Sequence, residues 1–298
     1  MSQMKLKNCP NSSKRPATSP FAAAFTFVEL LVIVGVLGLL LSLLIPTMSK
    51  SGLSSRAFQC LNNNRQLCNA WRMYADDSRD LIVYSSDDGT GATNPTNQYA
   101  WTWTHLDFNP GNRANWDITY DITLRPLWPY TGRNASIYRC PSDQSSVVIP
   151  GNGARLRVRS MSMNVYLGGF AGTDGGWPFI TPYRIYLKTT DLTSPGPAKT
   201  FVFLDQRFDA INWGNILVSM AGYNPPNPAA YEFEDLPGMY HDLGASFSFA
   251  DGHTELHRWT DPRTMPPIPL GQVSNGYPIP SPRNADIAWL QDHATRPK

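Results

Sequence analysis

The stretch from residue 25 to residue 46 constrains this chain more than any other feature. From Leu30 to Ile45 every residue is apolar except for glycines and Ser42. Residues 25–45 would form a helix of about 31 Å at 1.5 Å per residue. That length matches the hydrocarbon core of a bilayer, which is about 30 Å thick. The sequence therefore predicts a transmembrane helix over 25–46.

A single carboxylate, Glu29, lies near the start of this apolar run. An ionisable side chain at the centre of a bilayer costs about 2.5 kcal/mol or more, so such a residue is a candidate for a functional role. A glutamate that lies near the interface and reaches water is the simpler interpretation, and it stays open here.

The charges around the run predict its orientation. Residues 1–24 contain four basic residues and no acid, and Lys50 and Arg56 follow the run. The positive-inside rule then places the N-terminus in the cytoplasm and the C-terminal bulk across the membrane. A conventional secretory signal has an apolar region of about 7–15 residues that ends at a small-residue site. This run is longer and has no such site, which favours a retained anchor.

The segment Phe25-Thr26-Phe27-Val28-Glu29 and the apolar helix after it resemble the prepilin-type cleavage and methylation segment of type IV pilins and type II secretion pseudopilins. In that family a dedicated peptidase cuts before the Phe and methylates the new amine. A glutamate stands at mature position five and a proline often at position twenty-two, as Glu29 and Pro46 do if Phe25 is residue one. The family usually has Gly before the cut, and this chain has Ala24.

The resemblance implies cleavage between Ala24 and Phe25 and loss of the basic leader, residues 1–24. It implies that Glu29 pairs with the N-terminal amine of a neighbouring subunit and sets the register of assembly. Pro46 would kink the helix at the membrane exit. The implied partners are the prepilin peptidase, other pilin or pseudopilin subunits and an inner-membrane assembly platform. The implied location is the inner membrane, single-pass, with the C-terminal domain periplasmic or extracellular.

An amphipathic helix is predicted to continue over 47–78. Apolar residues recur every three or four positions from Leu53 to Ala75, which is the spacing of one helix face, and Asn64 interrupts them. The remaining residues, 79–298, are rich in Pro, Gly and Trp, which favours many short strands and loops. The predicted fold class is α+β, pilin-like: a long N-terminal transmembrane helix that extends into an exported helix packed on an antiparallel β-rich globular domain.

Cysteine spacing limits the possible disulfides. Cys9 would be lost with the leader. Cys60 and Cys68 lie about 12 Å apart along one helix, beyond the Cα separation of about 7 Å that a bridge tolerates. Any intrachain disulfide must therefore use Cys140, and Cys60–Cys140 is favoured over Cys68–Cys140 or no bridge. The chain has no Cys-x-x-Cys pair, so a zinc ribbon is unsupported and no cofactor is predicted.

A second resemblance covers scattered parts of the domain. Cys60-Leu-Asn-Asn-Asn-Arg-Gln-Leu, Tyr138-Arg-Cys140-Pro-Ser-Asp and Ser160-Met-Ser-Met-Asn164 are similar to segments of large prepilin-type proteins from planctomycetes, verrucomicrobia and their relatives. Members also carry a His, nine residues and then Asp-Gly, here His241 and Asp251-Gly252. The resemblance assigns no biochemical role to this motif. A structural, hydrogen-bonding role is the simpler interpretation of His241, and a catalytic one stays open.

Asp251-Gly252 predicts a two-residue hairpin turn, because both central positions of such a turn need positive φ. Ala250 would then oppose His253, and the three metal-ligand types His253, Glu255 and His257 would share one strand face. Zinc sites use such side chains with a fourth ligand, which His241 or Asp205 could supply, although the sequence does not show that either lies nearby. A polar, solvated strand face is the simpler interpretation, so these three residues are only weak candidates for metal binding.

The sequence predicts a protein that is not an enzyme and does not bind nucleic acid. It has no Gly-x-Ser-x-Gly, no phosphate-binding glycine loop and no His-Glu-x-x-His, and its net charge is only +2. The predicted function is that of a pilin or pseudopilin subunit, assembling into a pilus or a type II secretion pseudopilus. The alternative is a membrane-tethered surface protein that binds a glycan or another ligand, with Trp101 and Trp103 as stacking residues if they are exposed. A third interpretation is a metal-dependent surface enzyme.

Overall fold

The computed structural model describes residues 26–269, 271–273 and 277–298, and for 41–54 it describes the helical backbone alone. The predicted leader 1–24 and the processing site at Ala24 and Phe25 lie outside the described residues. The chain forms two compact units, Met1–Ser49 and Lys50–Lys298.

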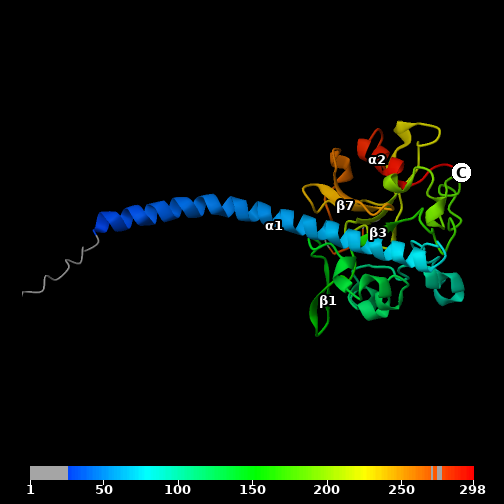
Figure 1. Cartoon of the computed structure of the whole chain (residues 1–298), viewed down its shortest axis with the longest axis horizontal. Helices are drawn as coiled ribbons and strands as arrows, with labels where there is room; N and C mark the ends of the chain where they lie inside the picture. The colour runs from blue at the N-terminus through cyan, green and yellow to red at the C-terminus, as the bar shows by residue number, and fades with distance from the viewer. Residues whose placement is uncertain (1–25, 270, 274–276) are drawn as a thin grey trace, which may run out of the picture. The chain divides into compact units, whose positions relative to one another are not determined.

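The first helix, α1 (Phe27–Asp77), is one continuous α-helix of 51 residues. It begins in the first unit and ends in the second (Figure 1). The helix passes the predicted boundary between residues 46 and 47 without interruption, and it ends one residue before the predicted end at 78. The backbone stays helical at Pro46, so the kink at this position stays a prediction.

The predicted transmembrane helix is wrong. Among the residues that the structure describes, no helix is both long enough and apolar enough to cross a membrane. This finding contradicts the spanning helix predicted over 25–46, and with it the predicted single-pass location in the inner membrane. The described chain is α+β with a mostly antiparallel sheet, but the fold class as predicted fails in its membrane-spanning element.

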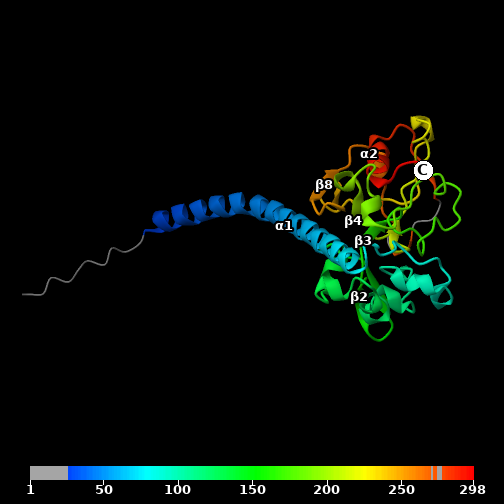
Figure 2. The same cartoon turned by 45° about the vertical axis from the view of Figure 1, so that its right-hand side comes forward.

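The second unit is built on a five-stranded sheet in the order β5-β3-β4-β7-β8. Figure 2 labels three of these strands, β3, β4 and β8. Its strands are β3 (Met161–Asn164), β4 (Phe201–Asp205), β5 (Asn215–Ile216), β7 (Gly244–Phe249) and β8 (Thr254–Arg258). Neighbouring strands are antiparallel except for the parallel pair β3–β5. Two small ribbons accompany the sheet: β1 (Ser146–Ile149) with β2 (Gly153–Leu156), and β6 (Glu232–Phe233) with β9 (Ile279–Pro280).

Short 3₁₀ helices fill much of the connecting chain, which is rich in Pro and Asn. They are η1 (Gly91–Thr93), η2 (Pro95–Tyr99), η3 (Arg113–Asn115), η4 (Ile118–Tyr120), η5 (Ile122–Leu124), η6 (Pro129–Thr131), η7 (Ala135–Tyr138), η8 (Thr189–Asp191), η9 (Pro197–Lys199), η10 (Pro228–Ala230) and η11 (Pro262–Thr264). Asn and Asp side chains cap several of them by accepting a backbone N–H, as Asn134 does for η7.

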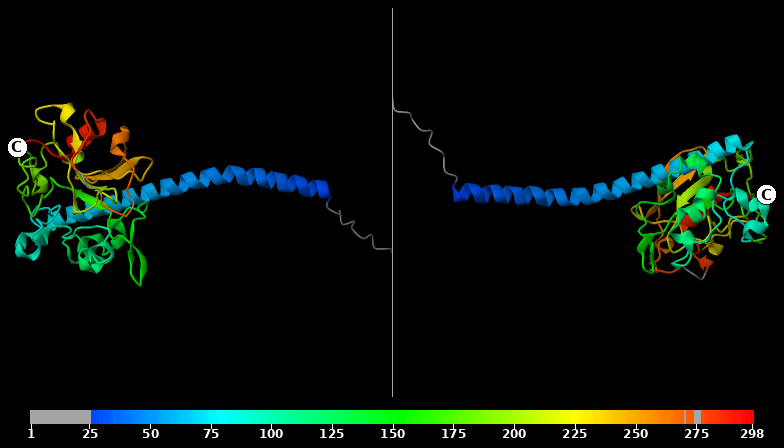
Figure 3. Two further views of the ribbon diagram at one scale, coloured as in Figure 1. Left: turned by 180° about the vertical axis from the view of Figure 1, so that it is seen from behind. Right: turned by 90° about the horizontal axis from the view of Figure 1, so that it is seen from below.

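The sheet is covered on both faces, which is why every residue of β4 and β7 is buried. On one face, the C-terminal part of α1 packs Leu67 and Trp71 into a cluster with Phe203. Figure 3 shows this part of α1 running beside the strands. On the other face, Phe247 and Leu290 belong to a second cluster, which brings in the C-terminal helix α2 (Ala285–Ala294).

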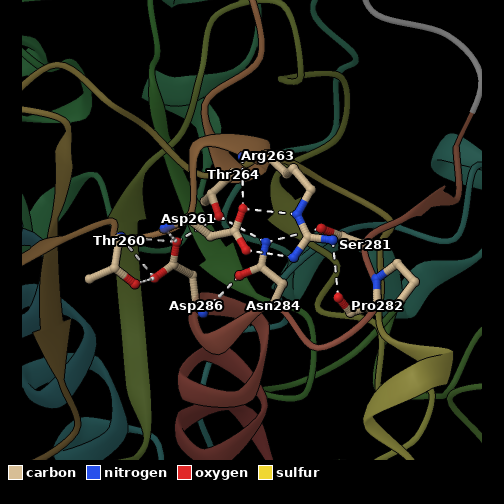
Figure 4. A network of polar contacts seen from close by, with 8 residues as sticks. All are labelled: Thr260, Asp261, Arg263, Thr264, Ser281, Pro282, Asn284 and Asp286. Carbon is tan, nitrogen blue, oxygen red and sulfur yellow. Dashed lines mark hydrogen bonds and ion pairs between the residues drawn. The ribbon is translucent and has the colours of Figure 1, made fainter.

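A buried polar network fixes the start of α2 (Figure 4). Asn284 caps the helix by accepting the backbone N–H of Asp286 at 2.8 Å. The Asp286 carboxylate accepts hydrogen bonds from Thr260, from the backbone of Asp261 at 3.0 Å and from the Thr264 hydroxyl at 2.7 Å. Through these hydrogen bonds Asp286 ties α2 to the segment that follows β8.

The hairpin β7–β8 differs from its predicted register by one residue. Ser248 opposes Thr254, not Glu255, and the turn between the strands holds three residues, not two. The backbone N–H of Phe249 donates to His253 at 3.0 Å, and Gly252 adopts φ 97° as the left-handed residue that a three-residue loop requires. A one-residue shift moves every β8 side chain to the opposite face of the sheet. His253, Glu255 and His257 therefore share the face of Phe247 and Phe249.

Candidate functional site

One face of α1 meets β7 and the turn after it over about three helical turns. Residues spaced four apart lie on the same side of a helix. Three contacts reach β7: Cys60 Sγ to Ser246 Oγ at 3.0 Å, Asn64 Nδ2 to Ser246 Oγ at 2.6 Å and Cys68 Sγ to the Phe249 carbonyl at 3.1 Å. A fourth contact, from Arg72 Nη1 to the Asp251 carbonyl at 2.8 Å, reaches the turn that follows β7. Asn64 interrupts the apolar pattern because it binds a buried serine.

At the first of these contacts, four side chains from distant parts of the sequence converge. The ligand atoms of Cys60, Cys140, Asp205 and His241 all lie within 4.8 Å of one another, and all four residues are buried. Cys60 comes from α1 and Asp205 is the last residue of β4. Cys140 follows η7, and His241 precedes β7.

Asp205 is held by one of its two carboxylate oxygens. Its Oδ1 accepts the Ser246 hydroxyl at 2.7 Å and also the Ser246 backbone N–H. Its Oδ2 has no hydrogen-bond partner among the described residues and lies 3.8 Å from His241 Nε2. A Cβ at Gly238 would lie 2.5 Å from both the carbonyl oxygen and Oδ2 of Asp205, so only glycine fits beside this carboxylate.

His241 and Cys140 face each other across 3.2 Å, measured from Nε2 to Sγ. Asp242 and Leu243, both at positive φ, form a two-residue turn in which His241 and Gly244 exchange backbone hydrogen bonds of 3.2 and 3.1 Å. The two-residue turn of this region is therefore at 242–243, not at 251–252. It aims the imidazole at the cluster.

Burial and mutual contacts shift the pKa values of all four side chains in the cluster. Burial raises the pKa of Asp205 and raises the pKa of Cys60 well above its usual value. Burial also opposes ionisation of Cys140, but its hydrogen bonds with Cys60 and His241 outweigh that effect and lower its pKa. Burial lowers the pKa of His241, whereas Cys140 and Asp205 raise it, and the net shift is upward. The raised pKa values favour the neutral forms of Asp205 and Cys60, whereas the shifts of Cys140 and His241 favour a thiolate beside an imidazolium.

The predicted Cys60–Cys140 disulfide is not formed. Cys60, Cys68 and Cys140, the three cysteines of the described chain, are free and buried. Cys60 and Cys140, the pair that the prediction favoured, do lie in one cluster. The Cys60 thiol is hydrogen-bonded to Ser246, however, and the Cys140 thiol to His241. Cys68 lies apart from the pair, and burial raises its pKa to about 12.

The weak metal candidates on β8 do not converge. Within the described ranges, His253, Glu255 and His257 are not part of any group of ligand atoms that could share an ion. His253 Nδ1 is instead 2.6 Å from Asp251 Oδ1. The His257 ring stacks on Trp289 of α2, with centroids 3.7 Å apart. These side chains join the aromatic packing between β8 and α2.

The two ends of the His-x9-Asp-Gly motif lie at the two ends of β7. His241 belongs to the buried cluster. Gly252 lies under Arg72 of α1, because a Cβ there would meet Arg72 Nη1 at 2.6 Å. The nine residues between His241 and Asp251 thus contain β7, the strand that α1 covers. Sequence reasoning named Asp205 only as a possible fourth ligand for the β8 residues, and the structure places it with Cys60, Cys140 and His241 instead. Its signal in the sequence is an acid that ends the buried run Phe-Val-Phe-Leu-Asp.

In the first unit, Glu29 takes part in a capping box. The Thr26 hydroxyl accepts the backbone N–H of Glu29 at 3.3 Å, and Glu29 Oε2 accepts the backbone N–H of Thr26 at 2.8 Å. This reciprocal pair is the signature Thr-x-x-Glu of a helix start. The hydrogen bond from the Thr26 backbone lowers the pKa of Glu29, so the carboxylate is ionised at neutral pH.

The helix after this cap exposes a continuous apolar surface. Its large apolar side chains are between 43% and 77% exposed over residues 27–40: Phe27, Val28, Leu30, Leu31, Val32, Ile33, Val34, Val36, Leu37, Leu39 and Leu40. A soluble helix normally confines such residues to one stripe. We call residues 27–40 the apolar segment. Its surface is suited to burial against other apolar helices.

Trp101 and Trp103 do not form an exposed stacking pair. Trp101 is completely buried, stacks on Tyr138 and donates from Nε1 to the carbonyls of Ser85 and Gly214. Trp103 is half-buried and covered by the Arg125 guanidinium, 3.9 Å from the ring centroid.

No family model, curated protein or solved structure matches this chain. The prepilin resemblance therefore depends on the motif of residues 25–29 and on Pro46. The buried cluster of Cys60, Cys140, Asp205 and His241 is defined by its geometry alone.

Proposed function

We propose that this chain is a pilin-like or pseudopilin-like subunit that assembles with related subunits through the apolar segment of α1. The exposed apolar surface of residues 27–40 is the observation that carries the proposal. Burying one large apolar side chain contributes about 1.5–3 kcal/mol. A surface of this size is therefore a strong drive for association.

We propose that the apolar segments of neighbouring subunits pack against one another. The later half of α1 packs Leu67 and Trp71 into the core of its own chain, whereas the apolar segment is exposed along its length. The motif Phe25 to Glu29 and the position of Pro46 support a filament of the pilin type, because both fall in the family register.

Glu29 serves two purposes in this proposal. Oε2 caps the first turn of the helix through Thr26. The ionised carboxylate also pairs with the N-terminal amine that cleavage before Phe25 creates on a neighbouring subunit. The prepilin peptidase supplies that cleavage, and an assembly platform inserts the processed subunit into the filament.

The two purposes are separated by a matched pair of variants. Glu29→Gln keeps an oxygen that accepts the Thr26 N–H and removes the charge. Thr26→Ala removes the cap hydroxyl and keeps the charge. We expect Glu29→Gln to lose most of its incorporation into sheared filaments, measured by immunoblot against total subunit, and Thr26→Ala to retain most of it. Incorporation of Glu29→Gln at the wild-type level would overturn the proposed charge pairing.

Processing is tested on the wild-type chain. Mass spectrometry of the purified protein should find an N-methylated Phe25 at the N-terminus. A chain that still begins at Met1 in cells with an active prepilin peptidase would contradict the processing step.

A second candidate function is the binding of a soluble oligosaccharide, and it rests on an aromatic groove of about 340 Å³. Aromatic and acidic side chains line the groove, among them Phe170, Trp177, Trp213, Glu234 and Asp235. Trp177 is 48% exposed, so its ring is available to stack on a sugar face. Trp177→Ala should abolish binding on a glycan array, with the buried Trp101 left intact. No wild-type binding to any glycan would exclude this function.

A further inference from the structure

We propose that Cys60, Cys140, Asp205 and His241 bind one zinc-class divalent transition-metal ion in a closed structural site. Two thiolates, one imidazole and one carboxylate form a ligand set that suits Zn²⁺. The inference is independent of the assembly function, because it concerns only the second unit.

The distances fit a tetrahedral ion. With metal–sulfur bonds of about 2.3 Å and metal–nitrogen or metal–oxygen bonds of about 2.0–2.2 Å, ligand atoms lie about 3.3–3.8 Å from one another. The observed separations are 3.2 Å between Cys140 Sγ and His241 Nε2 and 3.8 Å between His241 Nε2 and Asp205 Oδ2. All four ligand atoms lie within 4.8 Å of one another.

Asp205 supplies the observation that points to a ligand. Its side chain is 0% exposed, and Oδ2 has no hydrogen bond within the described part of the chain. A buried carboxylate oxygen without a donor is strongly unfavourable. The other oxygen is fully used by Ser246. One oriented oxygen and one unsatisfied oxygen are the arrangement of a monodentate metal ligand with an outer-shell partner.

Cys140 also has an outer-shell donor. The backbone N–H of Ser142 donates to Cys140 Sγ at 3.4 Å, and the Ser246 hydroxyl, which gives its proton to Asp205, lies 3.0 Å from Cys60 Sγ. Ser246 is in turn bound by Asn64. Neutral donors of this kind hold anionic ligands in place and let them keep their charge for the cation.

A catalytic relay fits the geometry less well. In a nucleophile–histidine–acid triad, the nucleophile and the acid contact different imidazole nitrogens. Here both Cys140 and Asp205 lie at Nε2, and Nδ1 has no partner among the residues described. The His241 side chain is 1% exposed, so no substrate reaches it. Structural metal sites are closed in this way, whereas catalytic ones keep an open position.

A bound ion would join parts of the fold that are distant in sequence. It would connect α1, the loop after η7, the end of β4 and the turn before β7. Metal binding of this type is coupled to folding, because the unfolded chain does not preform the site. The ion would clamp the C-terminal half of α1 to its sheet.

The test uses the full chain, purified reduced and without chelators, and then equilibrated with Zn²⁺. Elemental analysis should give one tightly held zinc per chain. Replacement by Co²⁺ should produce the charge-transfer absorption that reports thiolate–cobalt bonds. This optical signature identifies cysteine ligands in the wild-type chain, so it decides the proposal even if a variant fails to fold.

The variants assign the ligands. Cys60→Ser, Cys140→Ser and Asp205→Asn should each lose the bound zinc and weaken or abolish the cobalt absorption. Cys68→Ser is the matched control, because Cys68 is a buried cysteine on the same helix outside the cluster, and it should retain one zinc. Retention of one zinc by the folded Cys60→Ser and Cys140→Ser variants would overturn the site.

Two further outcomes would also overturn it. Wild-type chain that holds no zinc and shows no thiolate–cobalt absorption would exclude the ion. Protein whose unreduced mass shows the loss of two hydrogens, with Cys60 linked to Cys140 in its peptides, would show that the pair serves as a disulfide instead.

Discussion

The two halves of α1 are one continuous helix, yet they present opposite surfaces. Residues 27–40 expose large apolar side chains, whereas residues 60–72 contact the sheet through a stripe that includes Cys60, Asn64 and Cys68. The first half has a surface suited to many apolar partners. The second half has polar side chains that each match one acceptor on β7. In the second half, a few buried polar residues select the contacts with the sheet, and under the proposed function the exposed apolar side chains of the first half drive association.

The largest expected effect is the difference in stability between two variants, one with a truncated side chain in each half of α1. Trp71→Ala removes a fully buried ring from the contact with the sheet and should lower the free energy of unfolding by about 3–5 kcal/mol. Leu37→Ala shortens a side chain that is 53% exposed and should change the free energy of unfolding by less than about 0.5 kcal/mol. Chemical denaturation followed by circular dichroism measures both. Equal losses would show that the apolar segment is already buried within the chain.

Removal of the proposed metal ion should weaken only the contact between the second half of α1 and the sheet. At a zinc concentration of one hundred times the dissociation constant, binding stabilises the folded state by about 2.7 kcal/mol. A chelator should therefore lower the melting temperature of the wild-type chain. Cys140→Ser is the control, and its melting temperature should not respond to zinc or to chelator. A wild-type melting temperature that is indifferent to zinc would count against the clamp.

A smaller effect is expected at Ser246, where α1 and β7 share one hydroxyl. Ser246→Ala leaves Asp205, Asn64 and Cys60 without this partner and should cost about 1–3 kcal/mol of unfolding free energy. Ser248→Ala is the neighbouring control on the same strand, where the hydroxyl makes two long hydrogen bonds, from the Phe203 N–H at 3.3 Å and to the Phe203 carbonyl at 3.5 Å. A larger loss at Ser248 would contradict the assigned role of Ser246.

The smallest effect concerns pH and the first turn of α1. The pKa of Glu29 is lowered in the folded helix, so the capping contribution is present above its ordinary value of 4.5 and is lost as the pH falls through the lowered folded value. Amide hydrogen exchange of residues 27–30 should accelerate under acid, beyond the intrinsic pH dependence of exchange. Glu29→Gln should abolish this extra acceleration, and its persistence in that variant would show that another group titrates.

The local features of α1 were readable from the sequence. Apolar spacing predicts a helix that ends near residue 77, and helix ends are set by nearby side chains. Helix geometry alone also shows that Cys60 and Cys68 cannot be bridged. The capping box was equally local, and Thr26-x-x-Glu29 was its signal, although the prediction assigned Glu29 only to assembly.

Only the tertiary structure decided the rest. The register of β7–β8 depended on whether the turn holds two or three residues, which Asp251-Gly252 does not settle by itself. The predicted membrane-spanning helix failed on the described residues. The convergence of Cys60, Cys140, Asp205 and His241 was not readable in advance, because their proximity depends on strand order and on how α1 packs across the sheet. Local patterns fix local geometry, whereas a site built from distant segments is fixed only when those segments pack.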